Sequence, residues 1–153
     1  MASTITPYTH YWELIHTAGV DLSSATIKVA LVSSGYVFSA AHTIFDSGTN
    51  DAADPSYNEV TSGSGYTTGG IALANGVSHP AYIGYDNPIW TALTKTFRGA
   101  IFYFSGSVGG LTNPLIAYLL FDSSPADIAV TNSNYAIALD LLKGLFYNPA
   151  AYA

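Results

Sequence analysis

The first periodic segment of the chain lies close to its N-terminus and predicts a short α-helix over residues 7–18. Pro7 suits the first helical position, where no backbone N–H is needed, and Gly19 suits the left-handed position that follows a helix. The large apolar side chains recur at the spacing that places them on one helix face. They are Tyr8, Tyr11, Trp12 and Ile15.

Beyond residue 25 the pattern changes to alternation, which predicts β-strands as far as about residue 147. Ile27, Val29 and Leu31 mark one buried face of the first strand. Residues 95–104 are mostly apolar on both faces, so this strand should lie between two layers. The other expected strands, separated by Gly, Pro, Asn or Ser, are 58–61, 71–78, 81–85, 114–121, 127–131, 134–142 and 145–147.

Short strands at this spacing, with no helices alternating between them, favour a mainly β fold. We predict a single antiparallel β-sandwich or jelly-roll-like domain with a short N-terminal α-helix. Residues 36–57 follow no period and are expected to form a long ordered excursion, with one helical turn at 40–45 and an acidic, turn-rich part at 46–55. Asn75-Gly76 is expected to form either a hairpin turn or a β-bulge.

The composition is that of a compact folded protein. The 153 residues are enough for one domain with its own core, which we take to span 1–153. Apolar residues make up 49% of the chain and charged residues only 9%, which excludes intrinsic disorder. The longest apolar run, 115–121, is far too short for a membrane-spanning helix. The N-terminus shows no secretory signal, so we expect neither export nor a membrane partner.

The charged residues limit the partners further. Four basic residues against ten acidic ones give a net charge of −6, so direct nucleic-acid binding is not expected. Cysteine is absent, which excludes disulfides, thiolate catalysis and the common structural zinc sites. Because a monomer normally carries a more charged surface, we favour permanent assembly over a free monomer. The alternative explanation for the low number of charged residues is a monomer whose surface is rich in Ser, Thr, Asn and Gly.

Reactive side chains form no pattern typical of a catalytic or metal site. His10 and His16 point in different directions on the expected helix, and His42 and His79 lie in loops without a nearby carboxylate. The acidic residues of 46–54 lack the Gly and the bidentate Glu of a calcium loop. The Gly-rich segment that follows has the spacing GxGxxxG, not that of a dinucleotide-binding loop. We therefore expect no catalytic residue, no metal ion and no cofactor.

Aromatic residues supply the candidate partner contacts. Tyrosine and tryptophan side chains can line a sugar-binding platform or anchor a protein interface, although most of those on strands are expected in the core. The helix face and the aperiodic segment are not explained by a minimal sandwich. The candidate contacts are therefore Tyr8, Tyr11, Trp12, Tyr36, Phe38, Phe45 and Tyr57. For Trp12 the equal alternative is that it only covers its own sheet.

Several motifs occur in a fixed order along the chain. They are residues 21–36, 41–43, 58–60 and 65–70, Trp90, and residues 98–101 and 113–118. In this ordered set the chain resembles, from about residue 7 to residue 147, a family of small virion structural proteins of tailed bacteriophages. Several members of that family are similar to capsid cement or decoration proteins. The segments 46–55 and 148–153 depart from the family pattern.

The resemblance implies a capsid auxiliary protein that binds the major capsid protein and copies of itself. A symmetric trimer is a natural form for such proteins. The resemblance also implies a place on the capsid surface of the virion, synthesis in the cytoplasm of the host bacterium, and no cofactor. A tail or fibre component is the main alternative within the virion. A carbohydrate-binding module on the virion surface belongs to a different class, and an enzyme is the least expected.

Overall fold

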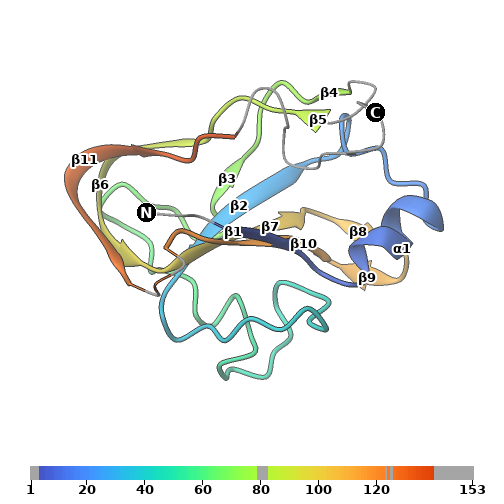
Figure 1. Cartoon of the computed structure of the whole chain (residues 1–153), viewed down its shortest axis with the longest axis horizontal. Helices are drawn as coiled ribbons and strands as arrows, with labels where there is room; N and C mark the ends of the chain where they lie inside the picture. Colours follow the sequence, from blue (N-terminus) through green and yellow to red (C-terminus); the bar gives the residue numbers. More distant parts are fainter. Residues whose placement is uncertain (1–3, 79–82, 123, 125, 140–153) are drawn as a thin grey trace.

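The computed structural model describes residues 4–78, 83–122, 124 and 126–139. The chain is mainly β, with antiparallel sheets and one short helix, which confirms the predicted class (Figure 1). In chain order the elements are β1 Thr4–Pro7, α1 Tyr11–His16, β2 Ile27–Val32, β3 Ile71–Ala72, β4 Val77–Ser78, β5 Ile83–Gly84, β6 Ile89–Phe97, β7 Gly99–Phe104, β8 Ser107–Val108, β9 Leu111–Thr112, β10 Leu115–Leu120 and β11 Ile128–Ala136.

A five-stranded antiparallel sheet forms the centre of the molecule, in the order β1-β10-β7-β2-β3. Its three middle strands are buried on both faces, because β7, β2 and β10 carry apolar side chains at nearly every position. The expectation that part of 95–104 lies between layers is thus confirmed for β7. Both faces of this sheet must be covered, and the chain covers them in two different ways.

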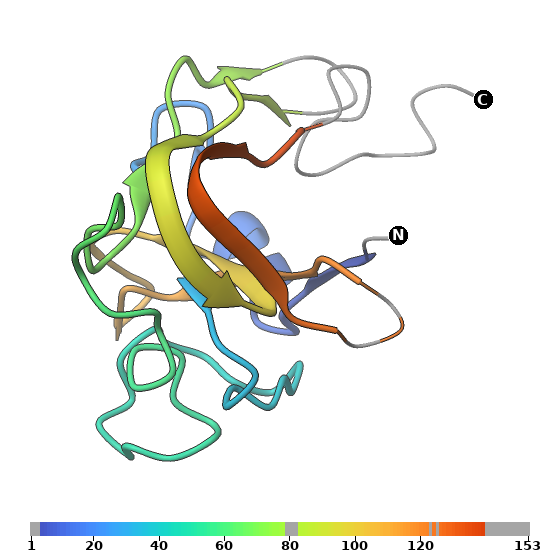
Figure 2. The same cartoon turned by 90° about the vertical axis from the view of Figure 1, so that its left-hand side faces the viewer.

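A long ribbon made of β6 and β11 covers one face of the sheet. Figure 2 shows the two strands side by side, curving in front of the central sheet. Phe97 and Leu93 of β6 are fully buried and join Phe102 of β7 in the larger hydrophobic cluster. Apolar residues of β11 pack on the edge of the same cluster. This cluster is therefore a core between ribbon and sheet.

The chain passes from the ribbon into the sheet at a single residue, Arg98. Its backbone N–H donates to Val32 O at 2.8 Å, and its side chain binds the carboxylate of Asp127 at 2.8 Å. Immediately after it, Gly99 lies against the ring of Tyr118, where a Cβ would approach the ring to 2.6 Å. The expectation of one strand over 95–104 is therefore wrong, because alternation of apolar residues continues through a corner between two sheets.

The aperiodic segment covers the second face. Phe45 stacks on Tyr103 of β7, with the ring centroids 4.2 Å apart, and Tyr36 packs against Tyr118 of β10. The predicted helical turn at 40–45 is wrong. The backbone there pairs with the start of β10 instead: Phe45 N–H donates to Asn113 O and Leu115 N–H to Thr43 O, both at 2.9 Å. The segment in 36–57 is thus an irregular lid over the sheet.

The helix is shorter than predicted. Pro7 ends the edge strand β1, opposite Ala117 of β10, and Tyr8 donates its backbone N–H to Ile116 O. Pro7 and Tyr8 adopt these pairings in place of the predicted helix, because Tyr8 can then be fully buried under the sheet. Gly19 adopts the predicted left-handed conformation, with φ +63°. The buried side chains of α1 are Tyr11 and Leu14, so the helix face differs from the one predicted.

The remaining expected strands are rearranged in the structure. Residues 71–78 form β3, which pairs with β2, and β4, which pairs with β5, so Asn75-Gly76 is a corner between two sheets and not a hairpin. The strand expected at 127–131 and the start of the one expected at 134–142 are the single strand β11, whose register shifts on both sides of Ser133, and residues 140–142 lie outside the described residues. Residues 58–61 form only an isolated bridge. The strand expected at 145–147 lies outside the described residues.

The helix α1 has six residues. In the part of the chain that the structure describes, no helix is long and apolar enough to cross a membrane.

Packing of the irregular lid generates the first prediction. Phe45→Ala should lower the free energy of unfolding by about 3 kcal/mol, because a large buried ring is lost from the sheet face. The control is Tyr57→Ala in the same segment, where the side chain is 61% exposed and the expected loss is below about 0.5 kcal/mol. Urea unfolding of the three proteins measures both. Equal losses in the two variants would show that the segment does not hold the sheet.

Candidate functional site

The structure divides the seven candidate contact residues into buried and exposed groups. Tyr8, Tyr11, Tyr36 and Phe45 are buried in the core of the chain itself, and Phe38 is half-buried against the cluster that contains Tyr8, Tyr36 and Phe45. Trp12 and Tyr57 are 52% and 61% exposed. Tertiary packing therefore uses most of these aromatics to cover the sheet. The prediction of partner contact continues to apply to Trp12 and Tyr57.

The buried tyrosines carry a short polar network under the irregular lid. The Tyr8 and Tyr36 hydroxyls are 2.8 Å apart, and the Tyr36 hydroxyl lies 2.9 Å from His42 Nδ1. Burial raises the pKa of Tyr36 to about 12 and raises that of Tyr8 further still, while it lowers the pKa of His42. All three groups are thus held neutral near pH 7, and the network ties the lid to the sheet.

Trp12 stands out on the surface of α1. Its ring makes an edge contact with Tyr11, at 5.0 Å between centroids, and stacks with His16 at 6.5 Å. Buried Tyr11 below and His16 beside it therefore support the exposed indole in one orientation. Such a preorganised aromatic group is typical of an interface anchor. The other large apolar side chains exposed among the described residues are Ile5, Val37, Tyr57, Val77 and Ile89.

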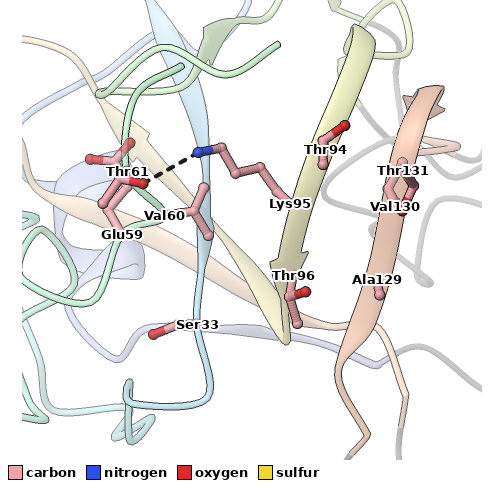
Figure 3. Close-up of a pocket in the computed structure, with 10 residues that line it drawn as sticks. All are labelled: Ser33, Glu59, Val60, Thr61, Thr94, Lys95, Thr96, Ala129, Val130 and Thr131. Carbon is pink, nitrogen blue, oxygen red and sulfur yellow. Dashed lines mark hydrogen bonds between the residues drawn. The ribbon is translucent and has the colours of Figure 1, made fainter. Parts of the chain in front are cut away.

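A polar groove of about 480 Å³ lies between residues 59–61 and the β6–β11 ribbon (Figure 3). Lys95 reaches across it from β6 and donates to Thr61 Oγ1 at 3.3 Å. Glu59 lies on the opposite side from the ribbon. The hydroxyl groups that line the groove belong to Ser33, Thr61, Thr94, Thr96 and Thr131. The groove thus offers hydrogen-bonding groups and one charge of each sign.

Glu59 connects the groove to the centre of the sheet. Its Oε1 accepts from the Tyr66 hydroxyl at 2.6 Å and from the Gly69 N–H at 2.7 Å, and the Tyr66 hydroxyl accepts the N–H of Leu31. Burial raises the pKa of Glu59, although these hydrogen bonds and nearby Lys28 oppose the shift. The carboxylate therefore fastens the Gly-rich loop to β2 at an electrostatic cost.

Sequence reasoning missed Glu59 and Tyr66. The Gly-rich segment 62–70 has the composition of a turn or flexible loop, yet it places Tyr66 in the core at 3% exposure. The available signal was an isolated acidic residue beside the apolar Val60, since such a residue needs local hydrogen-bond donors when buried. Pairing with a tyrosine seven residues away could not be read from the spacing, because the loop's path depends on contacts with β2 and β6.

The histidines do not converge on one place. His10 lines a separate pocket of about 350 Å³ beside α1, where its ring nitrogens are buried and form no hydrogen bond among the described residues, and burial lowers its pKa. His16 stacks on Trp12, and His42 bonds to Tyr36. His79 lies outside the described residues. Within those residues, no three His, Cys, Asp or Glu side chains come close enough to hold a metal ion.

The acidic loop uses its carboxylates to build turns. Asp54 accepts the backbone N–H groups of Asn50, Ser56 and Tyr57, and also the Ser56 hydroxyl. Burial acts to raise the pKa of Asp54, but these hydrogen bonds lower it overall. Asp51 in the same way accepts the N–H of Ala53. Asp51 and Asp54 are therefore occupied by loop structure.

Comparison with protein-family models, with curated proteins and with solved structures finds no match to this chain.

The buried carboxylate generates a prediction about pH. Since the pKa of Glu59 is raised in the folded state, its charge destabilises the fold at neutral pH, and this cost disappears as the pH falls through that pKa toward the ordinary carboxyl value. Glu59→Gln keeps an acceptor oxygen but removes the charge. We expect the unfolding free energy of the wild type, relative to this variant, to increase as the pH falls from 7 to about 4.5.

Chemical denaturation at a series of pH values measures the difference. Glu13→Gln removes one carboxylate at an exposed position on α1 and corrects for the change in net charge. A difference between wild type and Glu59→Gln that stays level, or that shrinks at low pH, would contradict the assignment of a raised pKa.

Proposed function

We propose that the chain is a bacteriophage virion structural protein, and in particular a capsid auxiliary protein of the cement or decoration type. The observation that carries this proposal is the exposed, supported indole of Trp12 on a surface with very few charges. A contact made by such a group depends on apolar burial and shape. The resemblance of the ordered sequence motifs to small virion proteins supports the same role.

Under this proposal the major capsid protein is the principal partner, and copies of the chain assemble with one another on the capsid surface. The protein would be made in the host cytoplasm and would need no cofactor. We also propose that the central sheet and the β6–β11 ribbon are the two layers of one sandwich-like domain. The shared hydrophobic cluster between them supports that arrangement, since two packed layers around one core define a domain.

A tail or fibre component would use the same kind of apolar contact and differs only in its position on the particle. A carbohydrate-binding module is less favoured. The residues that line the polar groove include no aromatic ring on which a sugar could stack. Outside the groove, the exposed aromatic side chains among the described residues are Trp12 and Tyr57, which would have to supply any such platform.

Localisation on purified particles tests the proposed function. We expect electron microscopy at subunit resolution to place the protein on the outer surface of the capsid shell, in contact with the major capsid protein. Density for the protein only at the tail would overturn the cement role and support the tail component. Particles that lack the protein entirely would overturn both.

The proposed anchor generates a further prediction. Trp12→Ala should weaken attachment to the particle by about 2 kcal/mol or more, because a central indole anchor is lost, while the melting temperature changes little. Val77→Ala on β4 is the control, since it also shortens an apolar side chain that is about half exposed. Occupancy on particles and thermal unfolding are measured for both. Full occupancy of the Trp12 variant would show that α1 is not the anchor.

A further inference from the structure

The two outer edges of the β6–β11 ribbon differ in whether another segment of the chain covers them. The Gly-rich loop covers the edge of β6, because Thr94 donates its backbone N–H to Ser64 O at 2.9 Å. The loop lies so close that a Cβ on Gly65 would meet the carbonyl oxygens of Thr91 and Ala92 at 2.6 Å. At Gly65 φ is +83°, a conformation that favours glycine. This edge is therefore closed by the chain itself.

The part of the chain that the structure describes does not cover the outer edge of β11 in this way. Among the described residues, β11 Ile128–Ala136 pairs with β6 alone. Six of its nine residues are exposed and the other three are half-buried, and none of the nine is charged or a proline. Natural proteins usually protect a long edge strand with lysine, proline or a covering segment, because its free N–H and C=O groups attract another strand. The pairing of β11 with β6 shifts register between Val130 and Ser133 and again between Ser133 and Tyr135.

We propose that β11 pairs antiparallel with β11 of a second copy of the chain. An edge of alternating N–H and C=O groups is satisfied by an extended strand, and not by a helix or a small ligand. The pairing would join two ribbons into a four-stranded sheet in the order β6-β11-β11-β6. The inference does not rest on the virion role, since it follows from the strand edge alone.

Charge favours a second copy as the occupant. The protein carries a net charge of −6, yet β11 contributes nothing to it, and the nearest carboxylate in the preceding chain, Asp127, is paired with Arg98 at 2.8 Å. Two identical β11 edges therefore approach without like charges facing each other. Antiparallel pairing of one strand with itself also has two-fold symmetry, so it closes as a dimer and leaves neither edge free.

The irregularity suggests the register. If the two-fold axis passes near Asn132, the two irregular stretches face each other and the regular stretch 128–130 of one copy lies opposite 134–136 of the other. Thr131 then lies opposite Ser133 of the second copy. These exposed hydroxyl side chains are of a kind that pairs well across antiparallel strands. The inference thus predicts a dimer, in contrast to the trimer that the family resemblance implies.

Introduction of like charges into β11 tests the pairing. In the variant Thr131→Lys/Ser133→Lys, the proposed register places lysines directly opposite lysines, and in Thr131→Glu/Ser133→Glu it places glutamates opposite glutamates. Sedimentation equilibrium should show a wild-type dimer and a dissociation constant raised at least about tenfold in each variant. An equimolar mixture of the two variants should restore the dimer as a heterodimer. Thr91→Lys/Thr96→Lys, which adds the same charge at exposed positions on β6, should leave the wild-type dimer intact.

Hydrogen exchange supplies a second readout that does not depend on the variants folding equally well. Backbone amides of β11 should exchange more slowly in concentrated wild type than in dilute wild type. A wild type that remains monomeric at the highest soluble concentration, or a larger oligomer that the β11 variants leave unchanged, would overturn the proposal. So would failure of the mixture to restore the dimer when both variants retain the wild-type circular dichroism. The virion role is tested separately by localisation on particles, so either proposal can fail alone.

Discussion

The architecture depends on one constraint: the three middle strands of the central sheet are apolar on both sides. A sheet of this kind cannot leave either face in water, because each exposed apolar face would forfeit the hydrophobic free energy that drives folding. The chain meets this requirement with a regular β-ribbon on one face and an irregular segment on the other. Leu93 and Phe97 fill the first interface, and Tyr36 and Phe45 fill the second.

Covering a sheet with tyrosines brings polar atoms into the core, and each of these atoms then needs a partner. The Tyr8, Tyr36 and His42 side chains satisfy one another under the lid, and Tyr66 satisfies both Glu59 and the Leu31 N–H beside the sheet. These contacts join segments far apart in the sequence. They fix the path of loops that have no regular hydrogen-bond ladder of their own, which explains how long aperiodic segments can remain ordered.

Once the sheet is covered, the surface that is left has a distinct character. It has few charges, one supported indole on α1, a polar groove beside Lys95, and an uncharged strand edge at β11. The indole suits contact with the shaped surface of another protein, whereas the strand edge suits pairing with a strand. These two features lie on different elements, so a copy of the chain could use both at once in an assembly.

The sequence by itself determined the fold class, the position of β2 Ile27–Val32 and the buried character of residues 99–104, because alternation and continuous apolar runs report local burial directly. It also indicated the left-handed conformation at Gly19. Alternation assigns the faces of a strand but not its neighbours, so the corner at Arg98 looked like the middle of a strand. Only the tertiary structure decided which aromatic side chains are exposed on the surface. Tyr8, Tyr11 and Trp12 have similar local patterns, yet Tyr8 is buried beside the pairing of β1 with β10, Tyr11 is buried on the inner face of α1, and Trp12 lies outside. That choice depends on contacts between distant segments, and no local pattern encodes such contacts.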